Sequence, residues 1–180
     1  RKASKGMTDS ENLDGCTLTD SELEELFEKQ VEGTFMWVNK EGQPFGVITY
    51  YLWSNGSFWF TCAEKRARVS AIRRNGYASF CITSKGTDLG TGKTASFRGP
   101  CKIHHDQSVL DWVLPQIARA CRPESEEGAQ EVFEHINTPN RVVLELTPEY
   151  RFDFDSAKMW EKSGKRVPPG RYSGNSGGKS

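Results

Sequence analysis

Two arginines stand where a predicted strand gives way to a predicted helix, and they are well placed to bind an anion. Arg66 and Arg68 follow a strand-like stretch at 57–62 and open the helical segment RARVSAIRRN. The free N–H groups and the dipole at a helix start attract negative charge. Two guanidinium groups there predict a phosphate site. The spacing alone is equally compatible with a solvated helix face that Arg73 and Arg74 continue.

A second phosphate-binding pattern is incomplete. The segment 86–94, GTDLGTGKT, has the glycines and the lysine of a P-loop, but the required first glycine falls on Thr87. A P-loop also needs a following helix, whereas the residues from Ala95 onward predict a strand. We therefore expect a loop that carries Lys93, and no nucleoside triphosphate site.

The histidines and cysteines do not form a metal site by their spacing. His104 and His105 are adjacent and would point apart on a strand, with Asp106 next and His135 far away, so a surface turn is the better interpretation. The five cysteines contain no CxxC pair and are odd in number. They predict free thiols in a reducing compartment. The sequence also lacks the GxSxG motif of serine hydrolases.

Composition excludes several classes of partner. The 180 residues contain 24 Lys and Arg against 24 Asp and Glu, so the chain has no net charge to attract nucleic acid or an anionic membrane. No stretch reaches the roughly 20 apolar residues that cross a bilayer. We expect a cytoplasmic protein with neither nucleic acid nor membrane as a partner.

The chain divides into three parts by composition. Residues 1–16 are polar and predict a flexible leader, 17–155 form one dense domain, and 156–180 form an extension. The end of that extension, from 163 onward, is rich in Gly, Ser and basic residues and is of low complexity.

The domain has the pattern of an α+β fold. Thr19 or Ser21 can cap a first helix, and a helical region covers 107–134 with interruptions at Pro115 and at Arg122-Pro123. Strand-like stretches lie at 34–40, 45–53, 57–62, 77–83, 95–103, 141–146 and 150–154, the longest with a corner at Gly99-Pro100. About six strands with late helices favour a mostly antiparallel barrel.

Four short motifs between Glu22 and Pro148 occur together in this chain. They are Glu41-Gly42-Gln43-Pro44, Phe58-Trp59-Phe60-Thr61-Cys62 followed by Arg66-Ala67-Arg68, Ile72-Arg73-Arg74-Asn75, and Ser96-Phe97-Arg98-Gly99. The chain resembles the pyridoxamine 5′-phosphate oxidase-like split barrels in these motifs. That family includes FMN enzymes and the deazaflavin-dependent reductases of actinobacteria.

The resemblance implies an antiparallel six-stranded split β-barrel with flanking helices, paired as a homodimer with FMN or the deazaflavin coenzyme F-420 at the interface. Carried over residue by residue, Arg66 and Arg68 would take the phosphate, Thr61, Cys62 and Ala63 would line its approach, and Pro44, Val47 and Thr49 would face the ring. Three residues depart from the family pattern, namely Arg68 for Lys, Ala71 for Asn and Gly76 for Pro. The changes at Arg68 and Ala71 leave the choice of cofactor open, whereas the change at Gly76 affects only the helix end.

The function implied by the resemblance is that of a flavin-type oxidoreductase that transfers hydride to or from a small organic substrate. The cofactor carries that chemistry, so we name no catalytic residue. One alternative is a non-catalytic protein that binds the cofactor or haem. Another is a true pyridoxamine 5′-phosphate oxidase, which needs a second basic set, but Arg141, Arg151 and Lys158 are scattered in the sequence. Lys158, Met159 and Trp160 could close the partner's site or pin the C-terminal segment to the barrel.

Overall fold

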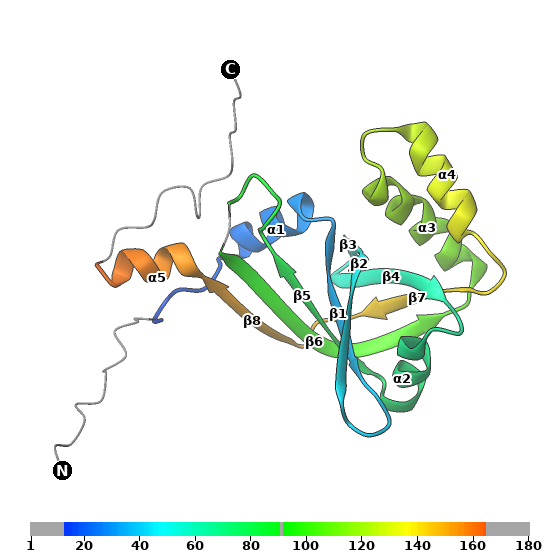
Figure 1. Ribbon diagram of the computed structural model, residues 1–180, viewed down its shortest axis with the longest axis horizontal. Helices are drawn as coiled ribbons and strands as arrows, with labels where there is room; N and C mark the ends of the chain where they lie inside the picture. Colours follow the sequence, from blue (N-terminus) through cyan, green and yellow to red (C-terminus); the bar gives the residue numbers. More distant parts are fainter. Residues whose placement is uncertain (1–12, 91, 165–180) are drawn as a thin grey trace, which may run out of the picture.

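The computed structural model describes residues 13–90 and 92–164, and a curled antiparallel sheet dominates it (Figure 1). Within these residues the sheet has eight strands in the order β2-β1-β5-β6-β7-β4-β3, with β8 paired to β6 off this path. The strands are β1 (Glu32–Val38), β2 (Pro44–Tyr50), β3 (Leu52–Ser54), β4 (Ser57–Ala63), β5 (Tyr77–Thr83), β6 (Lys93–His104), β7 (Arg141–Leu146) and β8 (Tyr150–Asp155). The helices are α1 (Asp20–Lys29), α2 (Ala67–Asn75), α3 (Gln107–Cys121), α4 (Glu126–Ile136) and α5 (Ser156–Lys162). The predicted α+β class with an antiparallel sheet and flanking helices is confirmed.

The sheet has eight strands, more than the predicted six, because each of the seven strand-like stretches forms a strand and one of them divides in two. The stretch 45–53 divides at Tyr51, whose side chain enters the core and is 4% exposed. The Tyr51 N–H donates to the carbonyl of Val31, and its hydroxyl donates to the carbonyl of Phe27. Because Tyr51 points into the core, the chain stops pairing with β1 at Tyr50 and pairs with β4 from Leu52 onward.

The long strand β6 joins the two halves of the sheet. Its first half pairs with β8 as far as Arg98, and its second half pairs with β7 from Cys101 onward. The change of partner falls at Gly99 and Pro100, where the sequence predicts a corner. A Cβ on Gly99 would lie 1.9 Å from the Thr147 carbonyl oxygen, so only glycine allows the connection between β7 and β8 to approach β6 this closely.

Aromatic side chains fill the concave side of the sheet. Phe58 is fully buried, and its ring centroid lies 5.3 Å from that of Phe27, 5.0 Å from that of Phe80 and 4.9 Å from that of Phe97. Phe27 comes from α1, which begins with the predicted cap at Thr19. Edge-to-face and tilted contacts of this kind favour one fixed packing, which makes the sheet a rigid support.

Helices α3 and α4 form a hairpin that packs on the other side of β4 and β7 (Figure 1). The predicted break at Arg122-Pro123 is confirmed, because α3 ends at Cys121 and α4 begins at Glu126. The predicted interruption at Pro115 is wrong, since α3 continues through it. Proline removes one helix hydrogen bond, but buried neighbours such as Leu114 hold this helix against the sheet.

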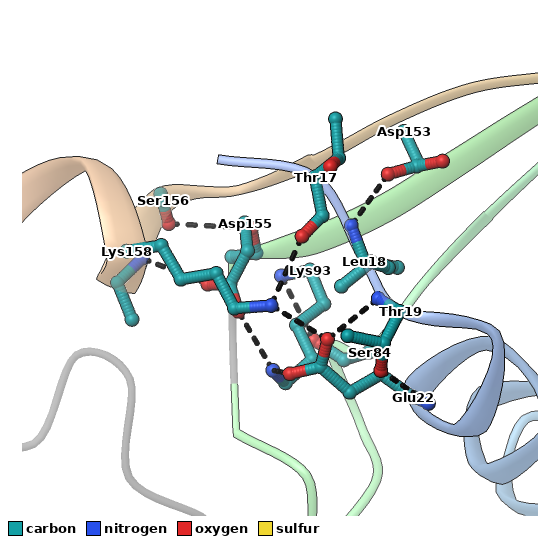
Figure 2. Close-up of polar contacts among 12 residues, drawn as sticks. Thr17, Leu18, Thr19, Glu22, Ser84, Lys93, Asp153, Asp155, Ser156 and Lys158 are labelled. Atoms are coloured by element: carbon teal, nitrogen blue, oxygen red, sulfur yellow. Dashed lines mark hydrogen bonds and ion pairs between the residues drawn. The ribbon is translucent and has the colours of Figure 1, made fainter. Parts of the chain in front are cut away.

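The two ends of the described chain pack together. Cys16 is 1% exposed, and its carbonyl accepts a 2.7 Å hydrogen bond from the N–H of Asp155. Lys158 on α5 donates to the Thr17 carbonyl at 2.9 Å and lies 2.6 Å from Glu22 (Figure 2). Lys158 thus pins the C-terminal segment to the barrel, one of the two roles expected for it. Residues 1–12 of the predicted leader and 165–180 of the predicted extension lie outside the described residues.

None of the helices within 13–90 and 92–164 combines the length and the apolar character that a membrane span needs.

Candidate functional site

The junction between β4 and α2 places the two predicted phosphate-binding arginines at a helix start. The N–H of Arg66 donates to the Ala63 carbonyl at 3.0 Å, which turns the chain from the end of β4 into α2. Arg66 is the N-cap residue, and its side chain does not cap the helix. The N–H of Val69 donates to the Arg66 carbonyl at 2.9 Å, whereas those of Ala67 and Arg68 have no partner within the helix, and the helix dipole favours an anion there. The helix ends as predicted at Gly76, whose φ is +70°.

The side chains of Arg66 and Arg68 differ from the other arginines of α2. Arg66 is exposed and Arg68 is half-buried, and neither makes a side-chain hydrogen bond or ion pair with another described residue. Arg73 instead pairs with Glu64, and Arg74 donates to the Val38 carbonyl at 3.0 Å. Arg73 and Arg74 are thus engaged by other residues of the described chain, whereas the side chains of Arg66 and Arg68 are not.

A third arginine, Arg141, belongs to the same cluster. It is the first residue of β7 and lies opposite Ala63 in the register of β4 and β7. Burial lowers the pKa of its guanidinium, and the neighbouring charges of Arg66 and Arg68 lower it further. In the sequence Arg141 is one of several scattered basic residues. Only the pairing of β4 with β7, which no local motif announces, brings it to this place.

The other predicted residues of β4 divide between two faces of the sheet. Thr61 and Ala63 share the face that carries Arg141, and the Thr61 hydroxyl donates to the Val142 carbonyl at 2.9 Å. Cys62 points the opposite way into the core and is 2% exposed. Its side chain therefore does not line the surface that Thr61 and Ala63 share, in contrast to the expectation.

The predicted residues of β2 also lie on two faces. Pro44 is exposed, whereas Val47 packs against the core and Thr49 is half-buried. Strand β2 pairs only with β1 within the described sheet, so no strand pairing joins these residues to the arginines of the β4–α2 junction. The β1–β2 hairpin nevertheless lies beside α2, because Phe45, next to Pro44, and Ala67, between Arg66 and Arg68, line one pocket of about 460 Å³.

The outer face of β1, β5, β6 and β8 is largely apolar and exposed. A cavity of about 480 Å³ lies on it, with Pro44 at one end and Phe152 at the other. Phe152 is 64% exposed, Tyr150 is 56% exposed and Ile48 on β2 is 68% exposed. Arg98 covers the ring of Tyr150 at 5.0 Å from its centroid. Exposed apolar side chains gathered in this way are typical of surfaces that bind another molecule.

His104 and His105 each form a side-chain hydrogen bond with a glutamate. His104 is 6% exposed, and its Nε2 lies 2.7 Å from a carboxylate oxygen of Glu145. The predicted surface turn is therefore wrong for His104, which ends β6 beneath α3, whereas His105 is exposed. Across the described residues, no group of three or more His, Cys, Asp or Glu side chains could hold a metal ion.

All five cysteines are free thiols, as predicted. Burial raises the pKa of Cys101 to about 12 and that of Cys121 to about 11. These two thiols are therefore protonated near neutral pH and are poor nucleophiles.

Comparison with known proteins agrees with this architecture. The sequence profile described as pyridoxamine 5′-phosphate oxidase matches residues 19–154. A search of curated proteins finds no match. Among solved structures, a conserved hypothetical protein from Mycobacterium tuberculosis is similar, with a TM-score of 0.70 and 19% identity over 87% of this chain and 95% of the other.

Two further solved structures share the fold and differ in what their names say of them. An F-420 reductase is 18% identical, with a TM-score of 0.50 over 72% of this chain and 94% of the other. The haem storage protein HutZ from Vibrio cholerae is 14% identical, with a TM-score of 0.56 over 74% of this chain and 92% of the other. Because the profile match covers most of the domain, the chain belongs to the pyridoxamine 5′-phosphate oxidase-like family of split β-barrels.

Proposed function

We propose that this chain is a flavin-type oxidoreductase that binds FMN or coenzyme F-420 and transfers hydride to or from a small organic substrate. The observation that carries the proposal is the pair of guanidinium groups, Arg66 and Arg68, at the start of α2. Within the described residues no carboxylate neutralises them, so their charge is available to a ligand. FMN and F-420 both carry a phosphate group that could supply the missing negative charge.

The chemistry of the junction fits a phosphate group. Guanidinium groups form paired, charge-assisted hydrogen bonds with phosphate oxygens, each of which contributes about 1.5–3 kcal/mol. The N–H groups of Ala67 and Arg68 at the start of α2 add donors beside the arginine side chains. Arg68 replaces the family's frequent Lys and keeps the charge, whereas Ala71 offers no hydrogen bond in place of Asn. The proposed binding of the phosphate group therefore depends mainly on the arginines.

We further propose that the functional unit is a homodimer with its cofactor at the interface. The proposal is supported by the exposed apolar outer face, where Ile48 and Phe152 are each more than 60% exposed. The residues Pro44, Val47 and Thr49 would then contact the ring system.

A bound flavin or deazaflavin would supply the hydride chemistry itself. The residues of this chain would bind and orient that group, and we assign none of them a proton transfer. The five free thiols are compatible with a reducing compartment, so we expect the enzyme to act in the cytoplasm.

Two alternative functions would need residues that already form ion pairs or hydrogen bonds within the chain. A true pyridoxamine 5′-phosphate oxidase needs a second basic site, but Arg151 pairs with Asp20 and Asp153. A haem-binding role for the buried histidine would have to displace the hydrogen bond between His104 and Glu145. A protein that stores the cofactor without turnover would use the same arginines, and only an activity assay separates it from an enzyme.

The absorption spectrum of the purified protein and titration with FMN, F-420 and haemin test the proposal. The variant Arg66→Ala with Arg68→Ala should bind the preferred cofactor at least about 100-fold more weakly, because two charge-assisted hydrogen bonds are lost. Arg119→Ala with Arg122→Ala removes the same charge from the end of α3 and should bind as the wild type does.

Equal affinity in the two double variants would overturn the phosphate assignment. Binding of haemin in preference to both other ligands, with a Soret band in the purified protein, would replace the oxidoreductase by the haem-binding alternative. Hydride transfer with a nicotinamide donor, or from reduced F-420 to an acceptor, would establish turnover.

A further inference from the structure

The start of β7 is fastened to the junction that carries Arg66 and Arg68. Arg141 lies opposite Ala63, the last residue of β4. Glu64 follows Ala63 and Asn140 precedes Arg141. The N–H of Glu64 donates to the carbonyl of Asn140 at 2.8 Å. Arg141 therefore keeps a fixed position beside the loop that leads into α2.

The Arg141 guanidinium uses only its Nε to form a hydrogen bond within the described chain. Its Nε donates to the carbonyl of Ile136 at 2.7 Å. The two Nη groups make no hydrogen bond to the rest of the described chain, although a guanidinium has five N–H donors. The side chain is half-buried, so its direction is set while its outer donors stay available.

Three like charges held together oppose folding unless something compensates for them. Burial and the nearby positive charges of Arg66 and Arg68 lower the pKa of Arg141. Glu64 is close in the sequence, but its carboxylate pairs with Arg73 and His105. No other described carboxylate forms an ion pair with the three arginines.

We infer that Arg141 is a third binding residue for the phosphate group of the ligand, acting together with Arg66 and Arg68. A phosphate group presents several oxygens, and three guanidinium groups from two elements can hold it from different sides. Arg141 is the member that a hydrogen bond to the Ile136 carbonyl holds in place, and Arg66 is the exposed member. The identity of the ligand rests on the proposed function, whereas the anion site rests on the three arginines alone.

The test compares ligands that have a phosphate group with ligands that lack it. Arg141→Gln should weaken binding of FMN or F-420 by at least about tenfold, because one charge-assisted hydrogen bond is lost. It should leave the affinity for the phosphate-free counterparts, riboflavin and the deazaflavin riboside, unchanged. Arg119→Gln, on the exposed side of α3, is the matched control and should bind all ligands normally.

Arg141→Lys gives a second variant in case the glutamine variant unfolds. It keeps the charge, but the three donors of a lysine sit on one nitrogen and cannot reproduce the planar guanidinium, whose Nε donates to Ile136 while its Nη groups face the phosphate. Its affinity for FMN or F-420 should therefore fall between that of the wild type and that of Arg141→Gln. Urea unfolding of each variant establishes that the fold is retained.

The outcomes separate this inference from the proposed function. If the cofactor binds Arg141→Gln as it binds the wild type, or if phosphate-free ligands lose equal affinity, the inference is overturned and the proposed function stands. If the wild type binds neither cofactor, inorganic pyrophosphate becomes the probe. A loss of at least about tenfold for pyrophosphate in Arg141→Gln then supports the anion site without the oxidoreductase, and no loss overturns both.

Discussion

Two groups of charged residues lie at opposite ends of the sheet, and they are arranged in opposite ways. The first, which we call the paired cluster, joins α1, β6, β8 and α5, and Figure 2 shows its side chains pointing toward one another. Lys93 lies 2.8 Å from Asp155 and 3.5 Å from Glu22, and Lys158 lies 2.6 Å from Glu22. Each cation there has a carboxylate within the same chain.

The second group, the arginine cluster, gathers Arg66, Arg68 and Arg141 at the junction of β4, α2 and β7. It has positive charge and helix N–H donors but no paired carboxylate among the described residues. The comparison teaches that charge density alone does not reveal function. Charges that the chain neutralises itself hold the fold together, whereas charges left without a partner are available to a ligand.

The largest effect on folding should come from breaking the paired cluster. Lys93→Met removes the cation beside Asp155, whose side chain is 3% exposed, and leaves a buried carboxylate without its ion-pair partner. We expect the free energy of unfolding to fall by about 3 kcal/mol. Urea unfolding measures this loss, and Lys102→Met, at an exposed lysine on the same strand, is the control.

The same variant also tests whether the two clusters are independent. Anion affinity should not change in Lys93→Met at a urea concentration where the protein stays folded. A large loss of affinity in this variant would show that the comparison is wrong and that the paired cluster also serves the ligand.

A slightly smaller effect on the free energy of unfolding should come from binding of a ligand to the arginine cluster. A ligand present at 100 times its dissociation constant raises the free energy of unfolding by about 2.7 kcal/mol, because it binds the folded chain only. We expect FMN or F-420 to raise the melting temperature of the wild type and of Arg119→Ala with Arg122→Ala. The variant Arg66→Ala with Arg68→Ala should show no rise at the same ligand concentration, and an equal rise would place the ligand elsewhere.

The next effect in size should be the pH dependence of stability that Glu22 of the paired cluster causes. Burial raises the pKa of Glu22, but hydrogen bonds from Lys158 and Thr19 and the charge of Lys93 outweigh it and lower the pKa to about 2. A carboxyl with a lowered pKa stabilises the fold above its ordinary pKa of 4.5, and this stabilisation is lost as the pH falls from 4.5 toward 2. We expect Glu22 to contribute on the order of 1–2 kcal/mol, since solvent screens this partly exposed group.

Stability measured by urea unfolding between pH 6 and pH 2.5 checks the contribution of Glu22. The pH dependence should be shallower in Glu22→Gln than in the wild type. Glu24→Gln, an exposed glutamate of the same helix, should keep the slope of the wild type, and identical slopes in all three proteins would contradict the assignment.

The sequence predicts the parts of this comparison that depend on neighbours in the chain. The cap at Thr19, the end of α2 at Gly76 and the place of Arg66 at a helix start each follow from a few consecutive residues, and all are confirmed. Such features are set by backbone hydrogen bonding within one or two turns, so a short motif contains the necessary information.

The parts that depend on strand pairing could not be predicted in the same way. Arg141 reaches Ala63 only through the register of β4 and β7, which lie far apart in the sequence. Lys93 sits in a glycine-rich segment that resembles a phosphate loop, yet the packing of β8 beside β6 gives it a carboxylate partner. Cys62 belongs to an apolar run whose two faces are not distinguished by polarity, so its inward direction was not evident.

The smallest expected effect is also the one that separates the clusters most directly, because its sign differs between them. Arg68→Gln removes one of three like charges and no hydrogen bond to the described chain, so the ligand-free protein should become more stable by a few tenths of a kcal/mol. The gain should be larger at low salt, where repulsion is less screened. In the presence of the ligand the order should reverse. If urea unfolding shows that Arg68→Gln destabilises the ligand-free chain, then Arg68 has a structural partner, and the arginine cluster belongs to the fold in the same way as the paired cluster.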